Sequence, residues 1–107
     1  MNIDTILALS TENTAELLFR HAKMVEESGE FAEAMLVESG YLRHKTLKES
    51  ALGETADVMI CLLDTSRKLY SHLSDQEFKD ELQRQLDLKA QKWERIIIAP
   101  QRIENRP

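Results

Sequence analysis

The sequence predicts an all-α protein, a helical bundle of about four helices. Only three Gly and two Pro occur among 107 residues, and the strong helix formers Leu, Ala, Glu, Lys and Gln are frequent. Hydrophobic residues recur at intervals of three and four, whereas β-branched residues are scattered except for three consecutive isoleucines at 96–98. A chain of this length and ordinary globular composition is expected to form a single domain, residues 1–107.

Two helices are predicted within the first forty residues. A short helix is expected over residues 3–9, with Ser10 and Thr11 as caps for the next one. The second helix is expected to run over residues 11–39 and to end at Gly40, a common helix-stop residue. The predicted buried stripe of this helix consists of Leu17, His21, Met24, Ser28, Phe31 and Met35.

The third helix is predicted to begin near residue 46 and to end near residue 70. Thr46 followed by Glu49 has the form of a capping box. The middle of this helix contains VMICLL, residues 58–63, which is almost two turns without a polar side chain. We expect this run to be buried on nearly every side, by helices of the same chain or of a second copy.

The fourth helix, residues 75–97, is predicted from a second capping box formed by Ser74 and Glu77. Its last turns carry three basic residues at three-residue intervals: Lys89, Lys92 and Arg95. These side chains are candidates for binding phosphate groups. Basic residues near a helix C-terminus also complement the helix dipole, so both interpretations remain open.

Two pairs of acidic residues form the candidate functional site. Glu27 and Glu30 lie three residues apart on the second predicted helix, and Glu54 and Asp57 have the same spacing on the third. Each pair therefore projects from one side of its helix, and the pairs can meet if the helices pack antiparallel. Converging carboxylates without a counter-charge are unfavourable, whereas Mg²⁺ or Mn²⁺ takes oxygen ligands readily. The alternative is an acidic surface that is simply solvated.

Gly29 and Gly53 favour the metal hypothesis. Both are expected inside helices beside the acidic pairs, where a glycine costs about 1 kcal/mol relative to alanine. Missing side chains at these positions would allow close helix packing or leave space for a ligand.

The acidic pattern resembles that of the MazG-like all-alpha nucleoside triphosphate pyrophosphohydrolases. EESGE at 26–30 and ETAD at 54–57 are separated by 23 residues, and VMICLL follows. The signature of that family is EExxE, a variable gap and ExxD, and the resemblance covers about residues 15–70. It implies a bundle that assembles as a homodimer or, as a dimer of dimers, a homotetramer. It also implies Mg²⁺-dependent cleavage of (d)NTP to (d)NMP and pyrophosphate, as nucleotide-pool housecleaning.

The resemblance also implies roles for individual residues. The metal ligands would be Glu27, Glu30, Glu54 and Asp57. Glu26 would assist them, with a second ion or by orienting the attacking water. Either Glu26 or Glu27 would accept the proton of that water, and the sequence does not separate the two.

Charge and hydropathy limit the partners that the chain is expected to have. The net charge of −5 argues against non-specific binding of nucleic acid and against attraction to an anionic membrane. No apolar stretch approaches the length of a membrane span and no signal segment is recognisable, so a cytoplasmic location is expected.

Two other functions compete with the hydrolysis of nucleoside triphosphates. One is a related pyrophosphatase acting on phosphoribosyl-ATP or dUTP. The other is a helical interaction module without catalytic activity, whose acidic face would bind a basic protein.

Overall fold

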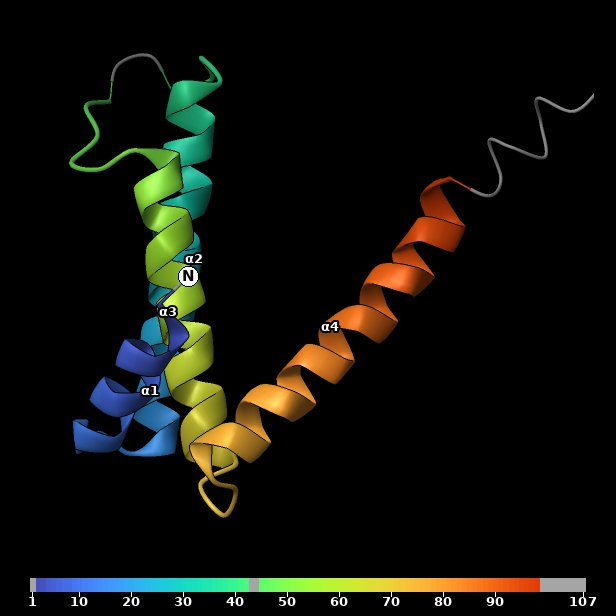
Figure 1. Ribbon diagram of the computed structural model, residues 1–107. Helices are drawn as coiled ribbons and strands as arrows, with labels where there is room; N and C mark the ends of the chain where they lie inside the picture. The colour runs from blue at the N-terminus through green and yellow to red at the C-terminus, as the bar shows by residue number, and fades with distance from the viewer. Residues whose placement is uncertain (1, 43–44, 99–107) are drawn as a thin grey trace, which may run out of the picture. The chain divides into compact units, whose positions relative to one another are not determined.

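The computed structural model describes residues 2–42 and 45–98, which form four helices and no strand. The helices are α1 (Ile3–Glu12), α2 (Leu17–Glu38), α3 (Ala51–Leu69) and α4 (Asp75–Ile97) (Figure 1). The prediction of an all-α fold is thereby confirmed. The chain divides into two compact units, residues 1–71 with the first three helices and residues 72–107 with α4.

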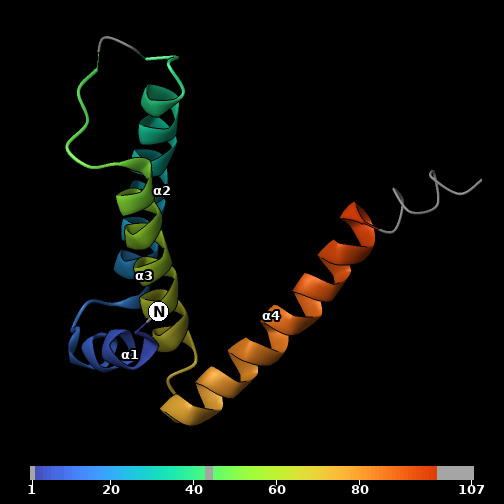
Figure 2. The ribbon, with the colours of Figure 1, turned by 45° about the horizontal axis from the view of Figure 1, so that its top comes forward.

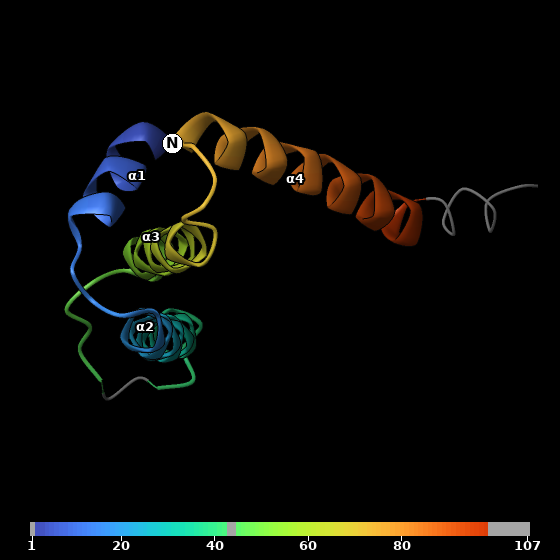
Figure 3. The ribbon, with the colours of Figure 1, turned by 90° about the horizontal axis from the view of Figure 1, so that it is seen from below.

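The first unit is built on an antiparallel pair of helices. α2 and α3 lie side by side along most of their lengths and run in opposite directions (Figure 2). Seen end-on, the two helices are direct neighbours, and α1 packs against α3 (Figure 3). Leu7 of α1 is fully buried and Ala34 of α2 is nearly so. The core of this unit therefore lies where α1 and α2 pack against α3.

The buried face of α2 differs from the predicted stripe by about one residue. Its buried residues are Arg20, Glu27 and Ala34, whereas Leu17 and Met35 of the predicted stripe are 36% and 46% exposed. The prediction was wrong because it counted apolar residues, and two of the three positions that face inward carry charge. The sequence pattern therefore located the helix but not its orientation.

Arg20 ties α1, α2 and α3 together. Its guanidinium is only 4% exposed and makes an ion pair with Asp64 of α3 at 2.8 Å. It also donates hydrogen bonds to the carbonyl oxygens of Ser10, Asn13 and Ala15, at 3.2, 2.5 and 2.8 Å. Every one of these acceptors lies at or just after the end of α1 or on α3, so a single side chain sets how the three helices join.

The boundary between the first two helices lies later than predicted. Ser10 and Thr11 do not cap α2; both lie inside α1, which continues through Glu12. The Ser10 hydroxyl donates to the carbonyl of Asp64 at 3.3 Å. Residues 13–16 then connect α1 to α2 without helical structure. Of the two residues expected as caps, Ser10 makes a contact with α3, and the Thr11 hydroxyl donates to the Leu7 carbonyl within α1 at 3.1 Å.

The start of α3 also differs from the prediction. Ser50, not Thr46, is the N-cap, and its hydroxyl oxygen accepts a hydrogen bond from the Gly53 amide at 3.1 Å. A carboxylate oxygen of Glu38 accepts from the Ala51 amide at 3.2 Å, which satisfies a second free donor of the first turn. The described residues before this helix, 45–50, form no helix; we call them the pre-helix segment. This segment is placed beside the acidic residues.

Two other predicted helix ends are confirmed. Gly40 follows α2 with a φ of 87°, a left-handed conformation that favours glycine. Ser74 and Glu77 form the reciprocal hydrogen bonds of a capping box at the start of α4. Both predictions depend on local backbone conformation and hydrogen bonding, and the packing of the helices does not change them.

The apolar run of α3 is not buried on every side by the other helices of the first unit. Met59, Ile60 and Leu62 are 40%, 46% and 47% exposed. The other helices of the first unit therefore do not cover this run on every side, and its burial by α4 or by a second copy stays a prediction. None of the helices in the described ranges is long and apolar enough to cross a membrane.

Replacing Arg20 by alanine is expected to destabilise the first unit by about 3 kcal/mol, because the Asp64 carboxylate then loses its partner in a largely buried place. Lys45→Ala removes the surface ion pair with Glu33, whose two side chains are about half exposed, and is expected to change stability by less than about 1 kcal/mol. Urea denaturation followed by circular dichroism measures both changes. Equal effects of the two substitutions would contradict this role of Arg20.

The position of the α3 cap gives a second prediction. Ser50→Ala is expected to lower the free energy of unfolding by about 1 kcal/mol, because the Gly53 amide loses its acceptor. Thr46→Ala removes the residue that the sequence suggested as a cap and is expected to leave stability almost unchanged. A larger loss for Thr46→Ala than for Ser50→Ala in the same urea titration would show that the helix begins earlier.

Candidate functional site

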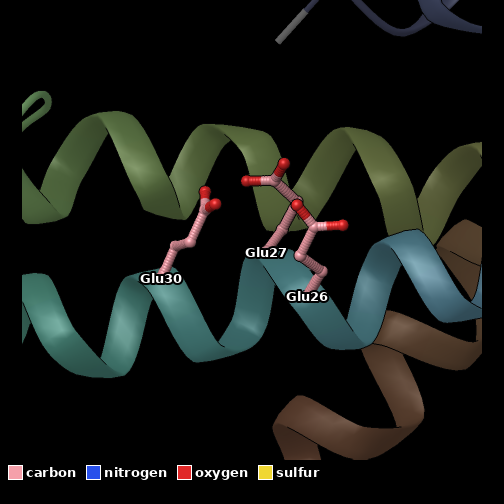
Figure 4. A group of neighbouring side chains, drawn as sticks. All are labelled: Glu26, Glu27 and Glu30. Atoms are coloured by element: carbon pink, nitrogen blue, oxygen red, sulfur yellow. The ribbon is translucent and has the colours of Figure 1, made fainter.

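The acidic residues of α2 and α3 converge in the middle of the antiparallel pair. Figure 4 shows Glu27 and Glu30 extending from α2 toward α3, with Glu26 beside Glu27. Carboxylate oxygens of these three residues lie within 4.8 Å of one another. The same holds for a second group, made of Glu27, Glu54 and Asp57. Glu27 belongs to both groups, so the structure brings together all five acids that the sequence singled out.

Two carboxylate oxygens at this place are buried without a hydrogen-bond partner. Glu27 and Glu54 are each only 8% exposed, and one oxygen of each, Oε2, accepts no hydrogen bond from any described residue. An unpaired buried oxygen of this kind costs roughly 1–3 kcal/mol, and more when it is charged. The two residues come from opposite helices and have carboxylate oxygens within 4.8 Å of each other, so one cation between α2 and α3 could neutralise both side chains.

The protein supplies little positive charge of its own. The ammonium of Lys23 lies 3.2 Å from a Glu27 oxygen and 3.4 Å from a Glu26 oxygen. The hydrogen bond to Glu27, followed by that to Glu26, raises the pKa of Lys23. No described lysine or arginine, Lys23 included, forms an ion pair with Glu30, Glu54 or Asp57. One half-exposed ammonium therefore faces a group of at least five acids.

The excess negative charge changes the proton affinity of the acids. The pKa of Glu54 is raised to about 7, first by burial and then by the charges of Glu30, Glu49 and Asp57. The pKa of Glu30 is also raised, first by a hydrogen bond with Glu27 and then by the charge of Glu27. Without a bound cation, part of this charge would be neutralised by protons near neutral pH.

Glu49 is a member of this group that the sequence analysis missed as a site residue. It lies in the pre-helix segment, and its side chain hydrogen-bonds with Asp57, which is the first cause of its raised pKa. Sequence reasoning assigned Glu49 to a capping box with Thr46, because the pair has the required spacing. Recognising Ser50 as the cap would have placed Glu49 just before α3, on the side of the acidic residues.

A cavity of about 460 Å³ opens beside the acidic residues. The pre-helix segment forms one wall, and α2 and α3 supply three acids. The lining residues are Glu30, Glu33, Thr46, Leu47, Lys48, Glu49 and Glu54. Its size falls within the range of roughly 300–1,000 Å³ that is usual for small-molecule sites. Lys48 gives this otherwise acidic wall a cation.

The two glycines do not serve close packing of the helices. A Cβ added at Gly29 would meet nothing within 4 Å, so α2 has open space there. A Cβ added at Gly53 would lie 3.5 Å from the Ser50 hydroxyl and 3.8 Å from a Glu49 carboxylate oxygen, which are ordinary contacts. The expectation that these glycines let α2 and α3 approach each other is therefore wrong. Gly29 is exposed and neither glycine lines the cavity beside the acids, so the other expectation, space for a ligand, stays a prediction.

The predicted phosphate-binding residues lie on α4, in the second unit. Lys89, Lys92 and Arg95 are exposed, and each lies within the helix as predicted. α4 and the acidic residues belong to different compact units. A role of these three cations in binding phosphate remains a prediction.

The donor set fits a hard divalent cation. All ligating atoms in the two groups are carboxylate oxygens, which Mg²⁺ and Mn²⁺ prefer over nitrogen or sulfur. Exposed acidic groups are common on helices without any ion, but burial of Glu27 and Glu54 with unpaired oxygens is not explained by solvation. The residues present could therefore hold a divalent cation such as Mg²⁺ or Mn²⁺.

Comparisons with known proteins add no further assignment: no family model matches the chain, and neither the curated proteins nor the solved structures contain a match.

The raised pKa of Glu54 predicts how stability depends on pH when no metal is present. The folded protein keeps the Glu54 proton up to about pH 7, whereas the unfolded chain releases it near the ordinary glutamate pKa of 4.5. The native state thus binds more protons between these values, so the free energy of unfolding falls as the pH rises through this window. Urea titrations in EDTA between pH 4.5 and pH 8 measure this slope.

Glu54→Gln is expected to reduce this pH dependence, because the amide does not titrate. Glu12→Gln, at an exposed position of α1, should leave the slope as it is in the unmodified protein. If the Glu54→Gln protein and the unmodified protein show the same pH dependence, Glu54 does not carry the raised pKa.

Proposed function

We propose that the protein is a Mg²⁺-dependent nucleoside triphosphate pyrophosphohydrolase that cleaves (d)NTP to (d)NMP and pyrophosphate. The observation that carries this proposal is the pair of buried, unpartnered carboxylate oxygens of Glu27 and Glu54, on opposite helices. The order and spacing of the acids, which resemble the MazG-like signature, connect this arrangement to nucleotide hydrolysis. Removal of unwanted nucleotides is the corresponding cellular role.

The acids divide into residues that would hold the ion and one that would handle a proton. Glu27, Glu30, Glu54 and Asp57 would hold Mg²⁺, or Mn²⁺ in its place. When bound, the ion neutralises phosphate charge and lowers the pKa of a water molecule. Glu27 belongs to both groups of acids and its side chain is 11% exposed, whereas the Glu26 side chain is 59% exposed. Glu26 is therefore the better candidate to accept the proton of the attacking water.

The cavity beside the acids would accept the substrate. Its volume of about 460 Å³ suffices for a nucleotide moiety, and Lys48 in its wall would bind phosphate oxygens. Lys89, Lys92 and Arg95 of α4 are the further candidates for phosphate binding that the sequence suggested. The described residues give no base-specific contact, so dUTP and phosphoribosyl-ATP stay in the panel of substrates to be tested.

Self-association is part of this proposal. Large apolar side chains are exposed on both helices of the antiparallel pair, among them Leu18 at 78% and Phe19 at 67% on α2. Together with Met59, Ile60 and Leu62 on α3, they would be covered in a homodimer or homotetramer. A catalytically inactive acidic module explains the site less well, because a surface that binds a basic protein needs exposed carboxylates and not buried ones.

The test is turnover of a panel of canonical and modified nucleoside triphosphates, with phosphoribosyl-ATP included, in Mg²⁺ and in EDTA. We expect (d)NMP and pyrophosphate in Mg²⁺ only. Glu54→Gln and Asp57→Asn should lower kcat/KM about 100-fold or more, since each removes a charge from the ion site. Glu12→Gln on α1 is the matched control and should keep full activity.

Two results would overturn this proposal. Release of orthophosphate instead of pyrophosphate would place the cleavage at another bond. Turnover that is equal in Mg²⁺ and EDTA would remove the ion from the reaction.

A further inference from the structure

We propose that Glu49 is an additional carboxylate ligand of the ion, so that ion binding fastens the pre-helix segment to α2 and α3. This inference rests on the proposed function, since it concerns the ion that Glu27, Glu30, Glu54 and Asp57 would hold. The additional ligand would come from outside the EExxE and ExxD motifs. Its bond to the ion would hold the pre-helix segment, which lines the cavity, against the two helices.

The local structure places Glu49 against the first turn of α3. Because Ser50 caps this helix through a hydrogen bond with the Gly53 amide, Glu49 is the last residue before the cap and is exposed at the start of α3. Its Oε1 atom lies 3.8 Å from where a Cβ of residue 53 would be, and Gly53 carries no side chain there. Glu49 therefore folds back over Gly53 toward the side of α3 that carries Glu54 and Asp57.

The neighbours of the Glu49 side chain are other acids. It lines the cavity together with Glu30 and Glu54, and the neighbouring carboxyl group of Asp57 contributes most to its raised pKa. Neighbouring carboxyl groups repel one another unless a proton or a cation lies between them. Glu49 is in neither of the two groups whose oxygens already lie within 4.8 Å of one another, so its side chain would move to reach the ion. One oxygen of Glu54, Oε2, is buried without a partner among the described residues and is available to the same ion. The juxtaposition of Glu49, Glu54 and Asp57 thus has the composition of an oxygen-only ligand set.

Glu33 is an acid of the same cavity that is not expected to bind the ion. It lines the same cavity, but its carboxylate is 2.9 Å from the ammonium of Lys45 and is already neutralised by it. No described cation forms an ion pair with Glu49. Glu33→Gln therefore removes one acid from the same cavity without removing a ligand, which makes it the matched control for Glu49→Gln.

The experiment is titration of the full chain with Mn²⁺ at pH 7.5, with free Mn²⁺ measured by its electron paramagnetic resonance signal. Glu49→Gln is expected to raise the Kd of Mn²⁺ about tenfold or more, and Glu33→Gln less than about twofold. Hydrogen exchange of the amides in residues 45–50 gives a second readout, independent of activity. Mn²⁺ should slow this exchange in the unmodified protein and not in Glu49→Gln.

The outcomes separate this inference from the proposed function. If the unmodified protein binds no Mn²⁺, the proposed function fails, and this inference fails with it. If it binds Mn²⁺ but Glu49→Gln binds equally well, or weakens only as much as Glu33→Gln, the proposed function stands and Glu49 is not a ligand. The hydrogen-exchange result also decides the role of Glu49. If Mn²⁺ does not slow amide exchange of residues 45–50 in the unmodified protein, Glu49 is not a ligand, whatever Kd the Glu49→Gln protein shows.

Discussion

The register between α2 and α3 is the constraint on which the site depends, and the buried ion pair of Arg20 and Asp64 holds it. Counting two turns from Arg20 along α2 leads to Glu27, and counting two turns back from Asp64 along α3 leads to Asp57. In an antiparallel pair, a contact between residues 20 and 64 therefore brings residues 27 and 57 opposite each other. The next turn brings Glu30 and Glu54 together in the same way. The ion pair of Arg20 and Asp64 near one end of the two helices thus sets a register in which the carboxylates near their middle lie close together.

This arrangement works against stability in the absence of a cation. Burial and neighbouring charge raise the pKa of Glu54 to about 7, and two carboxylate oxygens remain buried without partners. A sequence under no other requirement would replace such residues by apolar ones of similar size, which pack at little or no cost. Strained local electrostatics of this kind are frequent at functional sites, where a ligand offsets them. The proposed ion would offset this repulsion between the two helices.

Sequence reasoning identified the helices and the acids but not how the helices face each other. The four helices, the stop at Gly40 and the capping box at Ser74 depend on local chemistry, which the sequence displays directly. The buried face of α2 was misjudged because Arg20 and Glu27 point inward, and no pattern of apolar residues marks an inward charge. The start of α3 was misplaced because Thr46 with Glu49 and Ser50 with Gly53 compete as caps, and tertiary position decides between them. Glu49 was lost from the predicted site for that same reason.

Diffraction from crystals grown with Mn²⁺, recorded near the manganese absorption edge, measures the central claim most directly. The account predicts an anomalous peak between α2 and α3, at coordination distance, about 2.0–2.2 Å, from carboxylate oxygens of both Glu27 and Glu54. Anomalous density absent from this place, with those two oxygens turned outward to water, would contradict it.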